Sequence, residues 1–296
     1  MLALSSSNQT LASAYQSAKQ TLREAHLDSP HATPDLDARL LIAAACGLDD
    51  HAPLLHGEMK LSQIQCETIE SAISRRAAGE PVARIVGQKG FWGLDFIINE
   101  HTLIPRPETE GIVEGVVEWA RGKGRQNDAL RIVDIGTGSG AILVSLLHEL
   151  PQAIGVGVDI SKAALDVALE NAERHEVSER FSPVISNYGD ALSGPFDVIV
   201  SNPPYIGDHE RDDLPQDVRD YDPALALFAD NHGLQAYEHL LPWCSQNLAM
   251  SGFCMIEHGS TQAQDLKKLA SKYGLRRSEC VFDMANLPRF LKILRN

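Results

Sequence analysis

The tetrapeptide Asn202-Pro203-Pro204-Tyr205 has the residue types needed to hold an amide or exocyclic amine group. Its prolines fix φ and lack N–H donors, so the turn presents carbonyl oxygens. The Asn202 side-chain oxygen and the Pro203 carbonyl can accept both hydrogens of an NH₂ group, and Tyr205 offers a flat face. Such acceptors stabilise the positive charge that develops on an attacking nitrogen. We predict substrate binding by all four residues, with catalytic roles for Asn202, Pro203 and Tyr205.

A glycine loop earlier in the chain has the composition of a ligand-binding turn, Asp134-Ile135-Gly136-Thr137-Gly138-Ser139-Gly140. Glycines let a ligand approach the free N–H groups at the start of a helix. The spacing is G-x-G-x-G, and an acid stands two residues before the first glycine. This pattern suits a ligand with an amino group, such as the methionine end of S-adenosylmethionine (SAM), better than a pyrophosphate. A structural turn and an NAD(P) site remain alternatives.

Two further positions complete a predicted nucleoside site. Asp159 ends the strand after the glycine loop, where a carboxylate can accept both ribose hydroxyls, and this fits SAM and NAD(P) equally. After the next strand, Asn187 can bond an adenine edge and Tyr188 can stack on the ring. Packing of Tyr188 on a neighbouring helix is the alternative. Asn202 is expected to contact the cofactor as well as the substrate.

Alternating strands and helices position these groups. Strands are predicted at 131–135, 153–158, 196–200, 253–257 and 290–294, and helices at 141–150, 162–175, 233–248 and 262–273. Strands separated by helices of this length indicate a parallel, doubly wound, Rossmann-like α/β sheet. The ligand groups all follow strands, so we expect them at the carboxyl edge of the sheet.

The N-terminal part has the pattern of a small all-helical domain. Apolar residues recur every three or four positions over 11–25. Thr33 is a predicted helix N-cap, and Gly47 is placed to end that helix. Ser62 and Gln65 form a capping box for another helix.

Glycines among alternating apolar residues predict a β-hairpin after these helices. We therefore expect a helical domain at 1–83, a hairpin linker at 84–106 and an α/β domain at 107–296.

Composition narrows the function. The 296 residues carry a net charge of −14, which argues against a protein whose main affinity is for nucleic-acid phosphates. The five cysteines form no C-x-x-C pair and indicate neither a disulfide framework nor a zinc site. Residues 1–7 lack the pattern of a signal peptide, and no apolar run could span a membrane. We expect a cytoplasmic protein without a metal.

With these motifs in place, the chain resembles the PrmC/HemK family of SAM-dependent glutamine methyltransferases. The resemblance rests on Asp37–Leu41, Pro81–Trp92, Leu103–Glu110, the glycine loop, Asn202–Ile206 and Glu257–Gly259. The block Ile104-Pro105-Arg106-Pro107-Glu108-Thr109-Glu110 is more similar to the branch that modifies release factors than to the branch that modifies ribosomal proteins.

The resemblance implies that the domain at 1–83 recognises the substrate and that the domain at 107–296 is a SAM-dependent methyltransferase domain, and it implies roles for single residues. Gly136–Gly140 and Asp159 would bind SAM, Tyr188 would lie against adenine, and Asn202–Tyr205 would hold the glutamine amide in the Gly-Gly-Gln motif of class 1 peptide chain release factors. Family members often have an acid at the position of Asn187. Arg106, Thr109 and Glu110 are interpreted either as pins for the hairpin or as substrate contacts, and Glu257 and His258 as structural.

Other functions stay open at this point. The acceptors also suit a ribosomal-protein glutamine or the amino group of a DNA or RNA base, and a SAM-binding regulator or an oxidoreductase are weaker alternatives. The segment 208–222 holds seven acids just after the tetrapeptide. We hypothesise that it attracts a basic protein segment and repels nucleic acid.

Overall fold

The structure is a computed structural model that describes residues 9–25 and 33–295. The chain divides into two compact units, residues 1–88 with 213–221 and residues 89–212 with 222–296. The expectation about a signal peptide concerns residues 1–7, which lie outside the described residues. Among the described residues, no helix is both long enough and apolar enough to cross a membrane.

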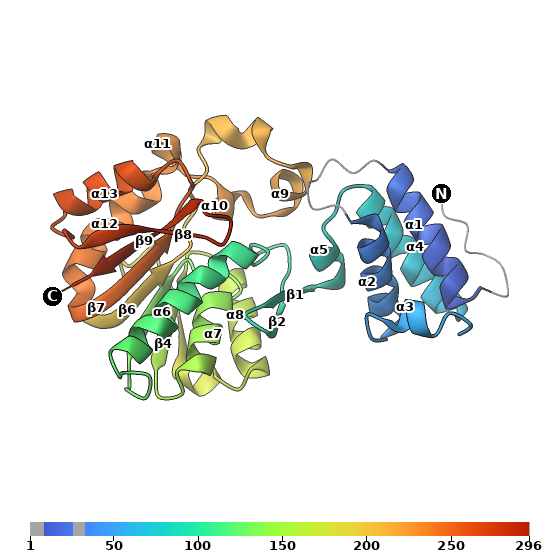
Figure 1. Ribbon diagram of the computed structural model, residues 1–296, viewed down its shortest axis with the longest axis horizontal. Coiled ribbons are helices and arrows are strands. Elements are labelled where there is room, and N and C mark those ends of the chain that lie inside the picture. Colours follow the sequence, from blue (N-terminus) through green and yellow to red (C-terminus); the bar gives the residue numbers. More distant parts are fainter. Residues whose placement is uncertain (1–8, 26–32, 296) are drawn as a thin grey trace. The chain divides into compact units, whose positions relative to one another are not determined.

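The first unit is all helical (Figure 1). Its helices are α1 (Leu11–Glu24), α2 (Pro34–Cys46), α3 (Ala52–Leu55), α4 (Gln63–Ala77), α5 (Val82–Val86) and α9 (Gln216–Tyr221). α4 begins with the predicted capping box of Ser62 and Gln65, and α2 ends at Gly47 in the left-handed conformation. Thr33 is the N-cap of α2 as predicted, but its side chain does not bond the helix backbone. The Thr33 hydroxyl donates to the Asp37 carboxylate at 2.8 Å, and no helix N–H uses it.

A buried ion pair crosses the helical unit. Arg76 of α4 donates to Asp37 of α2 at 2.8 Å, and both side chains are about 5% exposed. The guanidinium also donates to the carbonyls of Gly79 and Glu80. α2 and α4 are therefore joined by charge as well as by apolar contacts.

The segment 213–221 belongs to the helical unit although it follows the tetrapeptide in sequence. The Tyr221 hydroxyl donates to the Ala78 carbonyl at 3.4 Å. A Cβ at Gly79 would lie 3.2 Å from the Gln216 side chain, so glycine allows the close approach. The chain thus leaves the second unit after Asp212 and returns at Asp222.

The predicted hairpin consists of β1 (Gln88–Phe91) and β2 (Leu94–Ile97). It is held within the second unit by side chains on two helices. Glu110 accepts the N–H of Trp92 at 2.8 Å, and Asn171 exchanges two hydrogen bonds with the backbone of Ile97. Residues 84–87 belong to the first unit, so the units divide within the predicted linker at 88/89.

The second unit is built on a seven-stranded sheet in the order β5-β4-β3-β6-β7-β9-β8. The strands are β3 (Arg131–Ile135), β4 (Ile154–Asp159), β5 (Phe181–Ile185), β6 (Phe196–Ser201), β7 (Leu248–Glu257), β8 (Ser278–Phe282) and β9 (Pro288–Leu294). The first five strands in this order are parallel, as predicted. The expectation of a wholly parallel sheet is wrong for the far edge. β9 runs antiparallel to both β7 and β8, because a short turn rather than a crossover helix joins β8 to β9.

Helices cover both faces of this sheet (Figure 1). α6 (Glu110–Gly122), α7 (Ala141–Glu149) and α8 (Lys162–Arg174) share one apolar core with the sheet. α12 (Gln235–Asn247) and α13 (Ala263–Lys272) share the other. Alternate residues of β3 enter opposite cores, Ile132 the first and Val133 the second. This is the doubly wound, Rossmann-like arrangement expected from the sequence.

Candidate active site

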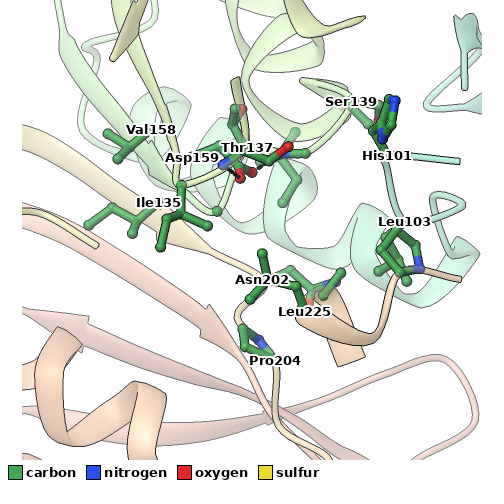
Figure 2. Close-up of a pocket in the computed structure, with 18 of the residues that line it drawn as sticks. His101, Leu103, Ile135, Thr137, Ser139, Val158, Asp159, Asn202, Pro204 and Leu225 are labelled. Atoms are coloured by element: carbon green, nitrogen blue, oxygen red, sulfur yellow. Dashed lines mark hydrogen bonds between the residues drawn. The ribbon is translucent and has the colours of Figure 1, made fainter. Parts of the chain in front are cut away.

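A pocket of about 580 Å³ opens at the carboxyl edge of the sheet. Figure 2 shows Thr137 and Asp159 on one side, Asn202 and Pro204 on another, and His101 and Leu103 opposite them. The pocket lies entirely in the second unit. Of the predicted site residues, it is lined by Gly136, Thr137, Gly138, Ser139, Asp159, Asn187, Tyr188, Asn202 and Pro204. Asp134, Gly140, Pro203 and Tyr205 are not among the lining residues.

The glycine loop turns between β3 and α7 through three left-handed residues. Gly136, Gly138 and Gly140 have φ of 77°, 55° and 80°, which side chains rarely adopt. A Cβ at Gly140 would also lie 3.1 Å from Ala168 of α8. Gly136 and Gly138 face the pocket, whereas Gly140 brings α7 and α8 together.

Asp134 lies at the end of β3, fully buried beneath the loop. One oxygen accepts the Thr137 hydroxyl at 2.7 Å. The other, Oδ1, has no partner with hydrogen-bond geometry among the described residues, although the Leu143 N–H also favours the charged form. Burial raises the pKa of Asp134 to about 7; the Thr137 hydrogen bond opposes this rise and the Asp159 charge adds to it. An unpartnered buried carboxylate oxygen is a strong acceptor for a cationic amino group.

Asp159 ends β4 beside the same loop. Its two oxygens accept the N–H groups of Ser161 at 2.9 Å and Gly138 at 3.0 Å. Burial raises the pKa of Asp159, although these two N–H groups favour its charged form. The backbone bonds hold the carboxylate in a fixed position at the pocket wall.

The loop after β5 brings Tyr188 to the pocket in a left-handed conformation, φ 49°. Its ring stacks on His239 of α12, with centroids 5.3 Å apart and planes inclined by 10°. A Cβ at Gly189 would overlap the Trp243 ring, so glycine lets this loop lie against α12. Asn187 is exposed at the pocket edge.

The tetrapeptide follows β6, and its four residues face different ways. Asn202 and Pro204 line the pocket, and Pro203 is buried. Tyr205 lies outside the pocket lining. Its carbonyl accepts from Gln262 at 2.9 Å, and its hydroxyl lies in the field of the Glu257 carboxylate. Burial, and then the Glu257 charge, raise the pKa of Tyr205 well above its usual value.

Behind Asn202, two buried side chains continue a line of hydrogen bonds. Asn202 Nδ2 donates to Thr109 Oγ1 at 3.1 Å, and Thr109 Oγ1 donates to Glu257 Oε2 at 2.7 Å. Thr109 and Glu257 are 4% and 1% exposed. Burial raises the pKa of Glu257 to about 7, with the Thr109 hydrogen bond opposing the rise.

Arg106 and Glu110, whose roles the sequence left open, do not take part in the hydrogen bonds from Asn202 to Glu257. Arg106 lines the pocket and forms an ion pair with buried Asp222 at 2.5 Å. Asp222 also accepts the N–H of Ile104. Glu110 accepts the N–H of Trp92, as one reading of the sequence expected. Arg106 and Glu110 thus pin backbone segments around the pocket.

Sequence reasoning missed several pocket residues. His101, Leu225 and His239 line the pocket and carry no motif that would have marked them. Glu257 was interpreted as structural from the sequence, and its closeness to Asn202 depends on the pairing of β6 with β7. In that register Ser201 lies opposite Ile256, which places the next residue of each strand at the same edge.

The pocket fits SAM on the evidence of its own residues. The unpartnered Asp134 oxygen can accept the amino group, the glycines keep side chains away from the approach, and Asp159 has a fixed carboxylate for the ribose. The Tyr188 ring can lie beside a purine. These residues offer partners for the amino, ribose and adenine parts of SAM.

Fold and site together define a Rossmann-like, SAM-dependent methyltransferase. A family model described as the PrmC N-terminal domain matches residues 13–87, and the methyltransferase small domain matches residues 125–218. The chain is 42% identical over 284 residues to the release factor glutamine methyltransferase of Bradyrhizobium diazoefficiens, covering 95% of this chain and 93% of the relative. It therefore belongs to the family of release factor glutamine methyltransferases.

Two further comparisons agree at different levels. The release factor glutamine methyltransferase of Agrobacterium fabrum is 38% identical over 264 residues, covering 89% of this chain and 91% of the relative. The solved structure of the hMettl16 catalytic domain, in complex with the MAT2A 3′UTR hairpin 6, is similar with a TM-score of 0.55 and 16% identity. That similarity covers 69% of this chain and 76% of the other, and it shows the fold alone.

Proposed function

We propose that this protein transfers the methyl group of SAM to the side-chain amide nitrogen of the glutamine in the Gly-Gly-Gln motif of class 1 peptide chain release factors. The observation that carries the proposal is the position of Asn202. Its carboxamide lies at the pocket wall beside the cofactor residues, in a chain that belongs to the release factor family.

The residues of the chain act by binding and orientation. An amide nitrogen is a poor nucleophile because its lone pair is delocalised. The Asn202 oxygen and the Pro203 carbonyl accept its two hydrogens, which favours pyramidalisation and stabilises the positive charge that develops on nitrogen. When bound, SAM supplies a methyl group already activated by its sulfonium, so the reaction requires no metal.

The second set of residues holds the donor. Asp134 and the loop from Gly136 to Gly140 would hold the amino acid end, and Asp159 and Tyr188 the nucleoside. Because Asn202 borders both sets, it would orient the substrate amide toward the methyl group. Apolar pocket residues such as Ile135 and Leu225 would limit water around the reacting atoms.

A methyl-transfer assay tests the proposal. The protein is incubated with methyl-labelled SAM and one of four substrates: a purified release factor, the same factor with the motif glutamine changed to alanine, a glutamine-methylated ribosomal protein in its unmodified form, or DNA. We expect label only on the intact release factor, and peptide mass spectrometry should place it on the motif glutamine.

The other outcomes separate the alternatives. Equal label on the alanine variant would contradict the proposed site. Label on the ribosomal protein alone would assign the chain to the other glutamine substrate, and label on DNA alone would assign it to base methylation.

A further inference from the structure

Asparagine can serve as an acceptor for the substrate amide only if its carboxamide faces the correct way. Its oxygen and nitrogen have nearly the same shape, so packing does not distinguish the two orientations. In this protein Asn202 presents Nδ2 to the Thr109 hydroxyl at 3.1 Å, which leaves Oδ1 for the pocket. This orientation therefore depends on Thr109 Oγ1 acting as the acceptor of the Asn202 N–H.

Glu257 makes Thr109 an acceptor, because it takes the hydrogen of the Thr109 hydroxyl. A hydroxyl has one hydrogen, and Thr109 donates it to Glu257 at 2.7 Å in a buried environment. With that hydrogen committed, Thr109 can only accept from Asn202. Without the carboxylate, the hydroxyl could donate to Asn202 Oδ1 and turn the amide round.

We propose that Glu257 is a positioning residue that, through Thr109, sets the orientation of the Asn202 carboxamide for the substrate amide. The inference rests on the proposed function. The three groups come from separate elements: Thr109 from the turn before α6, Asn202 from the residue after β6 and Glu257 from the end of β7. Parallel pairing of β6 with β7 places Asn202 and Glu257 at one edge.

The surroundings of Glu257 keep its Oε2 an acceptor. Oε2 accepts from Thr109 at 2.7 Å, and the positive charge of Arg289 favours the ionised form. Burial and the Glu108 charge work against ionisation. A protonated carboxyl still keeps one acceptor oxygen, so Oε2 can take the Thr109 hydrogen in both states.

Thr109→Val and Thr109→Ser form the matched pair for the test. Valine keeps the shape and removes the hydroxyl, so Asn202 Nδ2 would lose its buried acceptor and turn toward the pocket. Leaving a buried N–H unpaired carries a penalty that corresponds to roughly 5- to 150-fold. We expect T109V to lower kcat for release factor methylation within that range, with the Kd for SAM within about twofold, and T109S to retain most of the activity.

A double-mutant cycle tests Glu257 itself. A glutamine side chain at this position can turn its own NH₂ group to Thr109, so we expect E257Q to lower kcat by roughly threefold or more when Thr109 is present. In the T109V background, E257Q should cost clearly less, because the path through Thr109 is already broken. Any effect through Tyr205 is common to both backgrounds and cancels in the comparison.

Two results would overturn the inference while leaving the proposed function intact: full kcat in T109V, or a loss from E257Q that is the same in both backgrounds. Failure of the wild-type protein to methylate the release factor glutamine would instead overturn the proposed function. Thermal unfolding of each variant with and without SAM identifies a variant that has lost its fold. If E257Q has lost its fold, the comparison of T109V with T109S alone tests the inference.

Discussion

Asn202 combines two roles at the residue scale, because one end of its carboxamide is bonded to the protein and the other faces the pocket. Asn202→Ala should therefore lower kcat by about 100-fold, the size of effect seen when one preorganised polar group is removed from an active site. SAM is held by other residues, so its Kd should change far less. Single-turnover methylation and calorimetric SAM binding measure the two quantities. An unchanged turnover would refute the acceptor role.

Asp134 gives a prediction about pH. Its folded pKa is about 7 against an unmodified value of 3.8, so between these values the folded state binds a proton that the unfolded state releases. The stability contribution of Asp134 is therefore complete below about pH 4 and falls as pH rises to about 7.

Asp134→Asn removes this titration. Relative to the variant, the wild type should lose up to about 1.4 kcal/mol of unfolding free energy per pH unit across that window. Urea unfolding of both proteins without SAM at pH 5 and pH 7 checks the difference. Parallel curves would mean that Asp134 is ionised throughout the window.

The sequence predicts a site residue well when a local motif marks it, and poorly when its role depends on a contact with a residue far away in the sequence. The glycine loop, Asp159 and Asn202 each follow a strand, and the rule that ligands bind at carboxyl edges places them together. Thr109 and Glu257 are 148 residues apart, and their contact depends on strand pairing and on the turn before α6. Tyr205 was expected to face a substrate. Its closeness to Glu257 depends on the same strand pairing and could not be predicted from the tetrapeptide alone.

At the scale of elements, the pattern of apolar residues predicted most helices and strands of the parallel half with small errors, but β7 begins at Leu248 rather than at residue 253. α7 and α8 end one residue before the predicted limits, and β4 begins and ends one residue later. The antiparallel edge was harder to predict. β8 has a mixed, half-exposed pattern, and no local signal states that β9 inserts between β7 and β8. Residues 278–282 were accordingly not predicted as a strand.

The helical unit depends on an ion pair that joins two of its elements. Asp37→Ala would leave the Arg76 charge buried without its partner, which should cost about 3 to 5 kcal/mol. Urea unfolding measures this loss, and hydrogen exchange should show it in α2 and α4.

Asp35→Ala is the matched control. Asp35 lies on the same helix and pairs with Arg23, but both side chains are more than half exposed, so the expected loss is about 1 kcal/mol or less. Equal losses in the two variants would show that burial of the Asp37 pair is not what stabilises the unit.

At the scale of the whole molecule, the net charge is −14, but not all of the acidic side chains lie at the surface. Within the acidic segment 208–222, Asp217 and Asp222 are buried, and Asp222 is committed to Arg106. The segment is therefore not a uniform charged surface. Asp212 and Asp213 are exposed, and they stand where the chain passes from one unit to the other.

These two exposed acids follow closely on the residues that would hold the glutamine, so their field should favour approach of a basic protein segment. Asp212→Lys with Asp213→Lys should raise the KM for the release factor severalfold at low salt, with kcat at saturation nearly unchanged. The effect should shrink as salt approaches 0.5 M, because exposed charges are then screened within about 4 Å.

Glu118→Lys with Glu173→Lys applies the same change of charge on exposed helix positions of α6 and α8 and should leave KM within about twofold. If both pairs raise KM equally, net charge alone governs the encounter; if neither does, the acidic segment takes no part in substrate approach.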